Sequence, residues 1–155
     1  MEKVRIEETD SYVGPAAEKR PLTEVLGADE VAINYYELAP GDSFAFGYHA
    51  HEDQEEVFYV QSGTVTFETA AGPIDVGADE AIRFAPGEYQ RGTNEGTDRV
   101  VALAIGAPRE SGETDVLRDC ADCGERTAQR IEMTDDRDVL VTLCDDCCAE
   151  TGRFT

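Results

Sequence analysis

His49 and His51 stand one residue apart and are the only histidines in the 155-residue chain. On an extended strand both imidazoles would point to the same face, because side chains two residues apart share a face. Neutral histidine is the commonest protein ligand for metal ions. A carboxylate, Glu56, follows five residues after His51. A following antiparallel strand would bring it beside the imidazoles, which predicts three donors that leave coordination positions open.

The spacing of His49, His51, Glu56 and Gly63 resembles the first metal-binding motif of the cupin superfamily, whose members are small β-barrels. The resemblance implies that the two histidines and Glu56 hold a divalent ion. Glu55 is a competing carboxylate, and the seven-residue step to Gly63 favours Glu56. The alternative interpretation is a pair of partly buried histidines that bind no metal.

A second stretch, residues 77–94, is similar to the second motif of the same superfamily. It begins at a glycine, has Pro86-Gly87 in its turn and ends at Asn94. The superfamily usually has a histidine ligand where this chain has Gln90, so the resemblance implies Gln90 as a fourth and weaker donor. Cupins carry many unrelated chemistries, so the resemblance predicts the fold and leaves the reaction open.

The pattern of apolar runs predicts an all-β barrel or sandwich, and the resemblance implies that it is a cupin-type jelly-roll barrel over residues 1–108. Short runs rich in strand-forming residues recur between turn signals such as Pro40-Gly41 and Pro86-Gly87. A proline start and a glycine stop predict a short helix at residues 21–27, and residues 4–6 are expected to form an edge strand. The expected barrel strands are residues 31–38, 44–51, 57–61, 64–69, 74–76, 81–84 and 99–105.

All five cysteines lie beyond a linker predicted at residues 109–117. Two Cys-x2-Cys pairs, Cys120 with Cys123 and Cys144 with Cys147, are separated by 20 residues. Paired knuckles of this kind are typical of structural zinc sites. Residues 118–155 therefore resemble a zinc ribbon. A segment of about 40 residues cannot bury enough core to fold alone, so bound zinc would supply the missing stability.

Other interpretations of the cysteine-rich segment stay open. Cys148 is either a spare ligand or a free thiol. Disulfides are disfavoured because cytosolic thiols stay reduced, and a redox pair would not need two copies. Between the knuckles, residues 129–133 and 139–143 are expected to form a hairpin joined by residues 134–138.

Charge limits the partners of the protein. Thirty-four acidic residues face 13 basic ones, a net charge of −21. The excess is spread along the chain, which is typical of folded proteins from salt-rich cytoplasms, where salt screens repulsion between surface charges. Nucleic acid and anionic membranes are poor partners for such a surface. No apolar run approaches the ~20 residues needed to cross a bilayer, so a cytoplasmic protein is expected.

These features together predict a metal-dependent cupin that acts on, or binds, a small molecule inside its barrel. The ion is Zn, Fe, Mn or Ni, which the residues do not distinguish. Dioxygenase, isomerase and decarboxylase chemistry all fit, and no catalytic acid or base is assigned. The alternative is a non-catalytic module that senses a ligand or docks a partner, with a structural zinc ribbon. A homodimer is compatible with the sequence.

Overall fold

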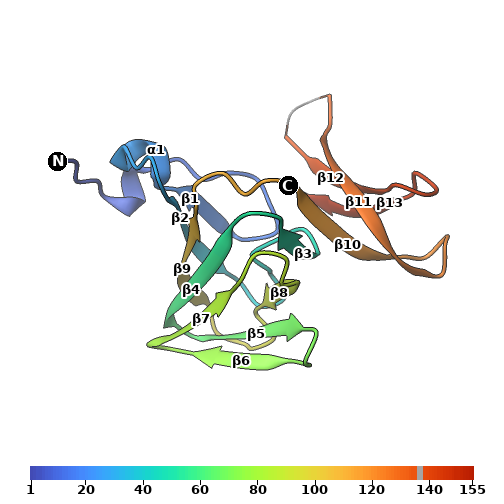
Figure 1. The fold of residues 1–155 in the computed structure, drawn as a ribbon, viewed down its shortest axis with the longest axis horizontal. Helices are drawn as coiled ribbons and strands as arrows, with labels where there is room; N and C mark the ends of the chain where they lie inside the picture. The colour runs from blue at the N-terminus through green and yellow to red at the C-terminus, as the bar shows by residue number, and fades with distance from the viewer. Residues whose placement is uncertain (136–137) are drawn as a thin grey trace.

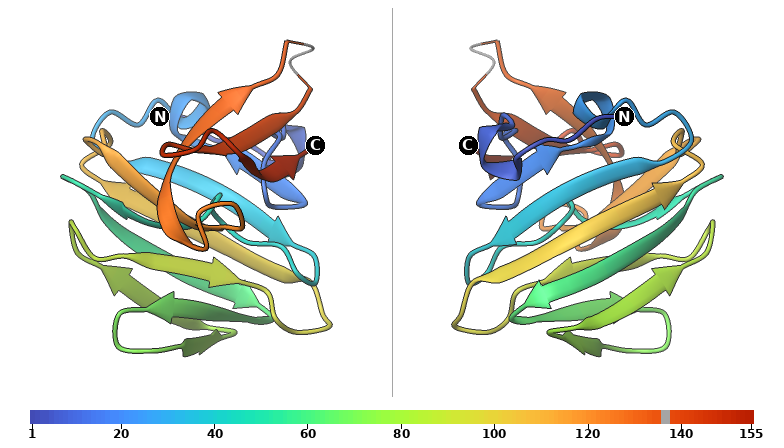
Figure 2. Two further views of the ribbon diagram at one scale, coloured as in Figure 1. Left: turned by 90° about the vertical axis from the view of Figure 1, so that its right-hand side faces the viewer. Right: turned by 90° about the vertical axis from the view of Figure 1, so that its left-hand side faces the viewer.

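The computed structural model describes residues 1–135 and 138–155, which form two antiparallel sheets (Figure 1). One sheet has the strand order β1-β2-β9-β4-β7, and the other has the order β13-β12-β11-β10-β3-β8-β5-β6. Two side views show the first sheet and the β3-β8-β5-β6 part of the second as facing layers (Figure 2). The all-β jelly-roll prediction is confirmed.

The helical elements are η1 (Ile6–Glu8) and α1 (Thr23–Leu26). The strands are β1 (Glu18–Pro21), β2 (Ala32–Leu38), β3 (Tyr48–His51), β4 (Glu55–Ser62), β5 (Thr64–Thr69), β6 (Ile74–Gly77), β7 (Glu80–Phe84), β8 (Gln90–Thr93), β9 (Val100–Ala107), β10 (Thr114–Cys120), β11 (Glu125–Met133), β12 (Leu140–Cys144) and β13 (Glu150–Phe154). Among the described residues, no helix has the length and apolar character that crossing a membrane requires.

The core lies between the two layers because strands such as β4 and β5 turn alternate side chains inward. In β4, Phe58 and Val60 are buried while Tyr59 between them is exposed. Phe67 of β5 packs against Phe58 with ring centroids 5.0 Å apart. Gly63, between β4 and β5, has a φ of 81°, a conformation that glycine adopts without strain. The expected turn at this position is therefore present.

The last strand to join the barrel, β10, begins inside the predicted linker. Residues 114–117 were expected to be irregular, but they pair with β3 in a regular antiparallel ladder. The register places Thr114 opposite His51 and Val116 opposite His49. β10 satisfies backbone groups along one edge of β3, which an irregular linker would leave unpaired. The linker prediction therefore holds at most for residues 109–113.

Three smaller expectations need correction or restriction. Residues 4–6 do not form a strand, because the chain turns into η1 at Ile6. The strand expected at residues 44–51 is shortened to β3, since the Ser43 hydroxyl donates to the carbonyl of Ala45 and bends the backbone before it. The connection expected at residues 134–138 lies partly outside the described residues.

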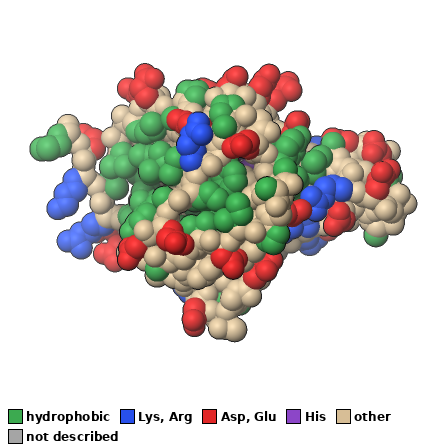
Figure 3. All heavy atoms as spheres, turned by 60° about the horizontal axis from the view of Figure 1, so that its bottom comes forward, with side chains coloured by type: hydrophobic (Ala, Val, Ile, Leu, Met, Phe, Trp, Pro, Cys, Tyr) green, Lys and Arg blue, Asp and Glu red, His purple; other side chains and the backbone are tan. Residues whose placement is uncertain are grey.

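Acidic side chains are scattered over the face drawn in Figure 3, with apolar and uncharged atoms between them. Several of the acidic residues pair with arginine at the surface, such as Glu37 with Arg99 at 2.5 Å. Exposed pairs of this kind add little stability, typically about 0–1 kcal/mol. The fold therefore depends on its apolar core and strand pairing rather than on surface charge pairs.

We expect a chain shortened to end at Arg109 to remain folded. The main apolar cluster lies entirely between Tyr36 and Ala104, and the two carbonyls that accept from Gln54, those of Pro108 and Arg109, are retained. Circular dichroism during urea unfolding should show one cooperative transition. A chain ending at Arg99 is the control and should not fold, because it lacks β9, which pairs with both β2 and β4. A non-cooperative transition in the longer of the two chains would contradict the expectation.

Candidate metal centre and cavity

His49, His51 and Glu56 converge inside the barrel. The Glu56 Oε2 atom lies 3.9 Å from His49 Nε2 and 3.6 Å from His51 Nε2. All three side chains are largely shielded from solvent, with at most 18% of each exposed. Both histidines lie on β3. The sequence suggested that Glu56 would reach them from a neighbouring strand, but it reaches them from β4, which belongs to the opposite sheet. The three donors meet because the two layers face each other.

The second nitrogen of each imidazole has its own oxygen partner. His49 Nδ1 lies 3.2 Å from the carbonyl oxygen of Gly47, and His51 Nδ1 lies 2.9 Å from the hydroxyl of Thr114 on β10. A carbonyl accepts only, so His49 carries its proton on Nδ1 when neutral. Its Nε2 is then an acceptor, 3.3 Å from the amide nitrogen of Gln90 and 3.9 Å from Glu56 Oε2. The Thr114 contact holds the His51 ring in the corresponding orientation.

The two neighbouring glutamates have opposite roles. Glu55 points outward and forms an ion pair with Arg83, with 2.5 Å between Oε2 and Nε. Glu56 points inward to the histidines. This difference follows from the alternation of side chains along β4, and the outward position of Arg83 agrees with it. The choice of Glu56 over Glu55 is consistent with this placement.

Gln90 completes the cluster from β8, where it pairs with His49 across the β3–β8 ladder. Its Nε2 lies 3.3 Å from His49 Nε2 and 3.1 Å from Glu56 Oε2. The side chain is buried, and its Oε1 atom has no hydrogen-bond partner among the described residues. A buried amide oxygen without a partner is costly. Rotation of the amide by half a turn would present this oxygen to the centre of the cluster.

Burial lowers the pKa of His49 below its ordinary value of 6.5. The carboxylate of Glu56 opposes this shift, since a negative charge favours the imidazolium, whereas His51 adds to it. Burial dominates, because removing a charged imidazolium from water is expensive. His49 is therefore held neutral near pH 7, which is the form that binds metal ions.

A cavity of about 290 Å³ opens beside the cluster. His49, His51 and Glu56 form part of its wall, and aromatic residues such as Tyr36 and Phe58 form another part. The polar groups that face it from elsewhere come from four parts of the chain. They are Lys19, Asn34, Gln54, Arg109, Ser111 and Thr114. The cavity combines apolar walls with convergent polar groups, and its volume suits a small ligand.

The C-terminal segment closes one side of this cavity. Val116 of β10 and Ile131 of β11 both line it. The segment is fixed to the barrel by Arg118, which donates to the carbonyl of Phe46 and, at 3.0 Å, to that of Thr151. Phe46 and Phe154 pack edge to face with centroids 5.0 Å apart. The cavity is therefore shared between the barrel and the segment predicted to be a separate ribbon.

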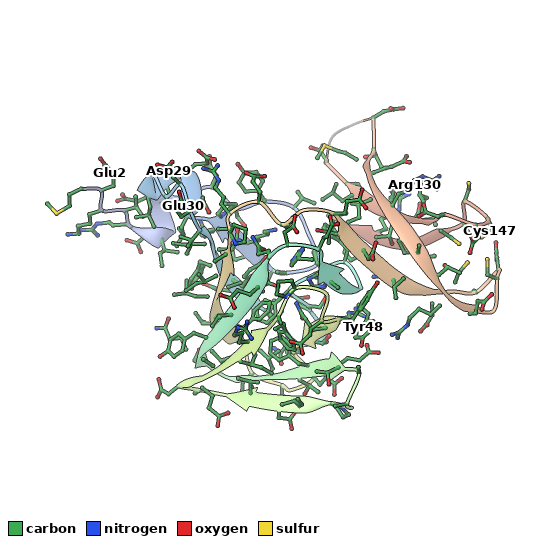
Figure 4. The ribbon with its side chains drawn as sticks, in the orientation of Figure 1. Glu2, Asp29, Glu30, Tyr48, Arg130 and Cys147 are labelled. Atoms are coloured by element: carbon green, nitrogen blue, oxygen red, sulfur yellow. The ribbon has the colours of Figure 1, made fainter. Side chains whose placement is uncertain are left out.

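The four cysteines Cys120, Cys123, Cys144 and Cys147 come together at the far end of the C-terminal segment. Their sulfur atoms all lie within 4.8 Å of one another, and the Cys120–Cys147 and Cys123–Cys144 distances are 3.5 and 3.8 Å. Figure 4 shows Cys147 at the end of the segment away from the barrel, while Tyr48 lies near the junction. The cluster is thus remote from the cavity.

Within the cysteine cluster, Cys144 is the residue whose surroundings favour the thiolate form. The hydroxyl of Thr127, 3.1 Å from its sulfur, and nearby backbone amides lower the pKa of Cys144 to about 6. Cys148 is exposed and outside the group of four, and its backbone is left-handed with a φ of 63°. Its amide donates to the carbonyl of Cys144 at 2.8 Å. The placement of Cys147 rather than Cys148 in the cluster matches the expected spacing.

Several cavity residues were not anticipated from sequence. Lys19 enters through the β1–β2 pairing, Arg109 follows β9, and Thr114 opens β10. None of the three lies in a recognisable motif. Their positions depend on strand pairings between distant parts of the chain. The nearest sequence signal is compositional, since Lys19 is one of only two lysines in the protein.

The fold and site define a jelly-roll barrel with an imidazole and carboxylate cluster beside an internal cavity. Residues 34–106 match the family model for the cupin domain. The matched stretch contains His49, His51, Glu56 and Gln90. No curated protein sequence gives a significant match to the chain.

Several solved structures have a similar fold. A sugar phosphate isomerase of the cupin superfamily from Silicibacter pomeroyi has a TM-score of 0.64 and 16% identity, over 99% of this chain and 91% of that chain. A predicted oxalate decarboxylase from Thermotoga maritima has a TM-score of 0.60 and 22% identity, over 68% and 98%. An oxalate oxidase in complex with glycolate has a TM-score of 0.57 and 15% identity, over 71% and 60%. At these identities the similarity shows the fold alone.

The lowered pKa of His49 predicts a pH-dependent stability in the metal-free protein. Below about pH 6.5 the unfolded chain binds a proton at this residue that the folded chain does not, so the free energy of unfolding falls as pH decreases through this window. Replacing His49 by Gln should reduce the dependence by up to about 1.4 kcal/mol per pH unit. Urea unfolding of both proteins between pH 7 and about pH 5.5 measures the difference. Equal slopes would contradict the prediction.

Proposed function

We propose that the protein binds a divalent metal ion through His49, His51 and Glu56 and that the ion acts on, or binds, a small molecule in the adjacent cavity. The observation that carries this proposal is the convergence of both imidazole Nε2 atoms on one carboxylate oxygen, at 3.6 and 3.9 Å. These three groups line the same cavity. A ligand in the cavity would therefore lie beside the bound ion.

The residues fit a metal ion in three respects. The Nδ1 contacts to Gly47 and Thr114 direct both Nε2 atoms into the cluster, where the Gln90 amide is the present partner of His49 Nε2. Glu56 adds one negative charge. The unpartnered Oε1 atom of Gln90 is a further donor, reached by rotation of its amide. Two nitrogens and carboxylate or amide oxygens form a set that suits Fe, Mn, Ni or Zn.

The bound ion would polarise a carbonyl or enediol oxygen of the ligand as a Lewis acid. The chain itself would orient the ligand, since Tyr36, Phe58 and Val116 form apolar parts of the cavity wall. Isomerase, decarboxylase and dioxygenase chemistry all fit this arrangement. The similar structures include a sugar phosphate isomerase and an oxalate oxidase, both of which act on oxygen-rich molecules.

A non-catalytic, ligand-sensing module is the second candidate. The observation that favours it is Gln90, a neutral amide at the position where the superfamily usually has histidine. The chain also has no histidine beyond the two in the cluster to act as a general base. Substrate-dependent turnover by the manganese-loaded protein, tested on oxalate and on sugar phosphates, would favour the enzyme. Binding of these molecules without turnover would favour the sensor.

We further propose that the four cysteines hold a structural zinc ion. Tetrahedral zinc with Zn–S bonds of about 2.3 Å places its sulfurs about 3.8 Å apart, and the observed separations of 3.5 and 3.8 Å are close to this value. A site filled by four thiolates has no open position, which suits a structural role. The apolar core of the barrel does not extend into this segment, so zinc would stabilise it.

A Glu56→Gln substitution should weaken metal binding at the barrel site. Loss of a direct ligand should reduce Mn²⁺ affinity by more than the about 10- to 100-fold typical of outer-shell changes. Mn²⁺ suits this test because it prefers oxygen and nitrogen donors to the soft thiolates of the cysteine cluster. Titration followed by electron paramagnetic resonance measures the affinity.

Glu55→Gln is the matched control for this experiment. It removes the same charge from the adjacent residue, whose side chain points outward to Arg83, so it should leave Mn²⁺ affinity unchanged. Equal weakening by both substitutions would indicate a general charge effect. Full retention of affinity in Glu56→Gln would exclude the proposed ligand set.

A second pair of variants tests the cysteine site. Cys147→Ser should release the zinc, because it removes one of four thiolates, and should loosen β11–β13. Cys148→Ser should keep one zinc per chain, because Cys148 lies outside the cluster. Metal analysis and hydrogen exchange of residues 118–155 provide the measurements. Zinc retained in Cys147→Ser but lost in Cys148→Ser would reverse the assignment of the fourth ligand.

A further inference from the structure

Lys19 is a cation inside the cavity, and strand pairing determines its direction. It lies on β1 opposite Tyr36 of β2. Its neighbours Glu18 and Arg20 pair with each other at 2.9 Å, and alternation along the strand directs Lys19 to the opposite side. There its Nζ lies 5.7 Å from the centre of the Tyr36 ring, and the side chain lines the same cavity as Glu56.

Lys19 lacks the charge partner that such a position normally requires. Within residues 1–135 and 138–155, no carboxylate forms an ion pair with its Nζ and no acceptor forms a hydrogen bond with it. Burial lowers the pKa of Lys19, while the Glu56 carboxylate opposes the shift from across the cavity. A shielded cation without a close partner is costly, and an anionic ligand would remove that cost.

Arg109, the other cation of the cavity wall, is already engaged. Its guanidinium pairs with Glu24 and donates to the carbonyl of Ala28 at 3.2 Å. Arg109 therefore contributes little free positive charge to the cavity. Lys19 is left as the cation available to a ligand.

The charge balance of the cavity depends on the ion proposed above. Without metal, Lys19 and Glu56 offset each other. A divalent ion at the histidines would outweigh Glu56, so the loaded cavity would carry excess positive charge. This occurs in a protein whose net charge of −21 otherwise repels anions. A cavity with this local charge favours an anionic molecule over a neutral one of the same size.

We propose that Lys19 is the anion-recognition residue of the cavity and that it binds a carboxylate or phosphate group of the ligand while another ligand oxygen meets the metal centre. This inference rests on the proposed function and names the ligand class, a small oxyanion. The cavity volume of about 290 Å³ suits a molecule with few heavy atoms. Lys19 acts here as a specificity residue, and no role in proton transfer is assigned to it.

The two lysines of the chain allow a matched test. Lys19→Met and Lys3→Met each remove one positive charge from the full-length protein, but Lys3 is exposed and lies outside this cavity. Binding of oxalate, D-fructose 6-phosphate and uncharged D-fructose is measured by calorimetry, in the metal-free and the Mn²⁺-loaded forms. Comparing oxalate with the sugar phosphate shows whether the cavity binds a carboxylate or a phosphate group. Thermal unfolding confirms that each variant is folded, and Lys19→Gln provides a second replacement.

Lys19→Met should weaken binding of at least one of the two anions about tenfold or more, the loss expected for one charge-assisted hydrogen bond. Lys3→Met should leave binding unchanged, and D-fructose should not respond to either substitution. Lys19→Arg should restore part of the affinity. Anion binding that is equal in Lys19→Met, Lys19→Gln and the parent protein would overturn the proposal. The proposal would also be overturned if the parent protein bound neither anion, with or without Mn²⁺.

The same data separate this proposal from the metal site. Lys19→Met should not weaken Mn²⁺ binding, because Lys19 is not a ligand and its removal takes a positive charge away from the site. If the parent binds no Mn²⁺ but Lys19→Met still loses anion affinity in the metal-free form, the metal centre fails and anion recognition stands. If Mn²⁺ binds and Lys19→Met has no effect on either anion, the metal centre stands and anion recognition fails.

Discussion

The pairing of β10 with β3 is the interaction on which the site and the C-terminal segment both depend. β3 carries the two histidines, and β10 covers one edge of it along residues 114–117. That pairing places the Thr114 hydroxyl at His51, sets Val116 in the cavity wall and starts the strand that ends at Cys120. Gly47 permits the close approach, since a Cβ there would lie 2.5 Å from the carbonyl oxygen of Leu117.

Charge is distributed differently inside and outside the barrel. Outside, carboxylates dominate and arginines such as Arg83, Arg99 and Arg126 are paired with them. Inside, Lys19 and Arg109 are the cations of the cavity wall, and they lie among neutral polar groups and the single carboxylate Glu56. His49, for example, is neutral and contacts the carbonyl oxygen of Gly47. An acidic surface lowers the local concentration of anions, so selectivity for an anion must come from groups within the cavity.

The sequence contained enough to predict the barrel and the four residues of the barrel cluster. His49 and His51 are two residues apart on one strand, and the alternation that separates Glu55 from Glu56 is a local property of β4. Gln90 required the resemblance to a family motif, because its partner His49 is 41 residues away. Lys19 and β10 had no local signal. Their positions follow from pairings with β2 and β3 that only the folded chain establishes.

The barrel and the cysteine-rich segment are therefore not separate units, because they share a strand and a cavity wall. One continuous strand, β10, carries a contact to the barrel site at its start and a cluster cysteine at its end. Zinc binding to thiolates is coupled to folding of the segment that holds them. Loss of zinc would loosen the C-terminal part of β10, and with it the packing of Val116 and Ile131 against the cavity. A structural metal at the cysteines would thus stabilise the wall of a ligand site that it does not touch.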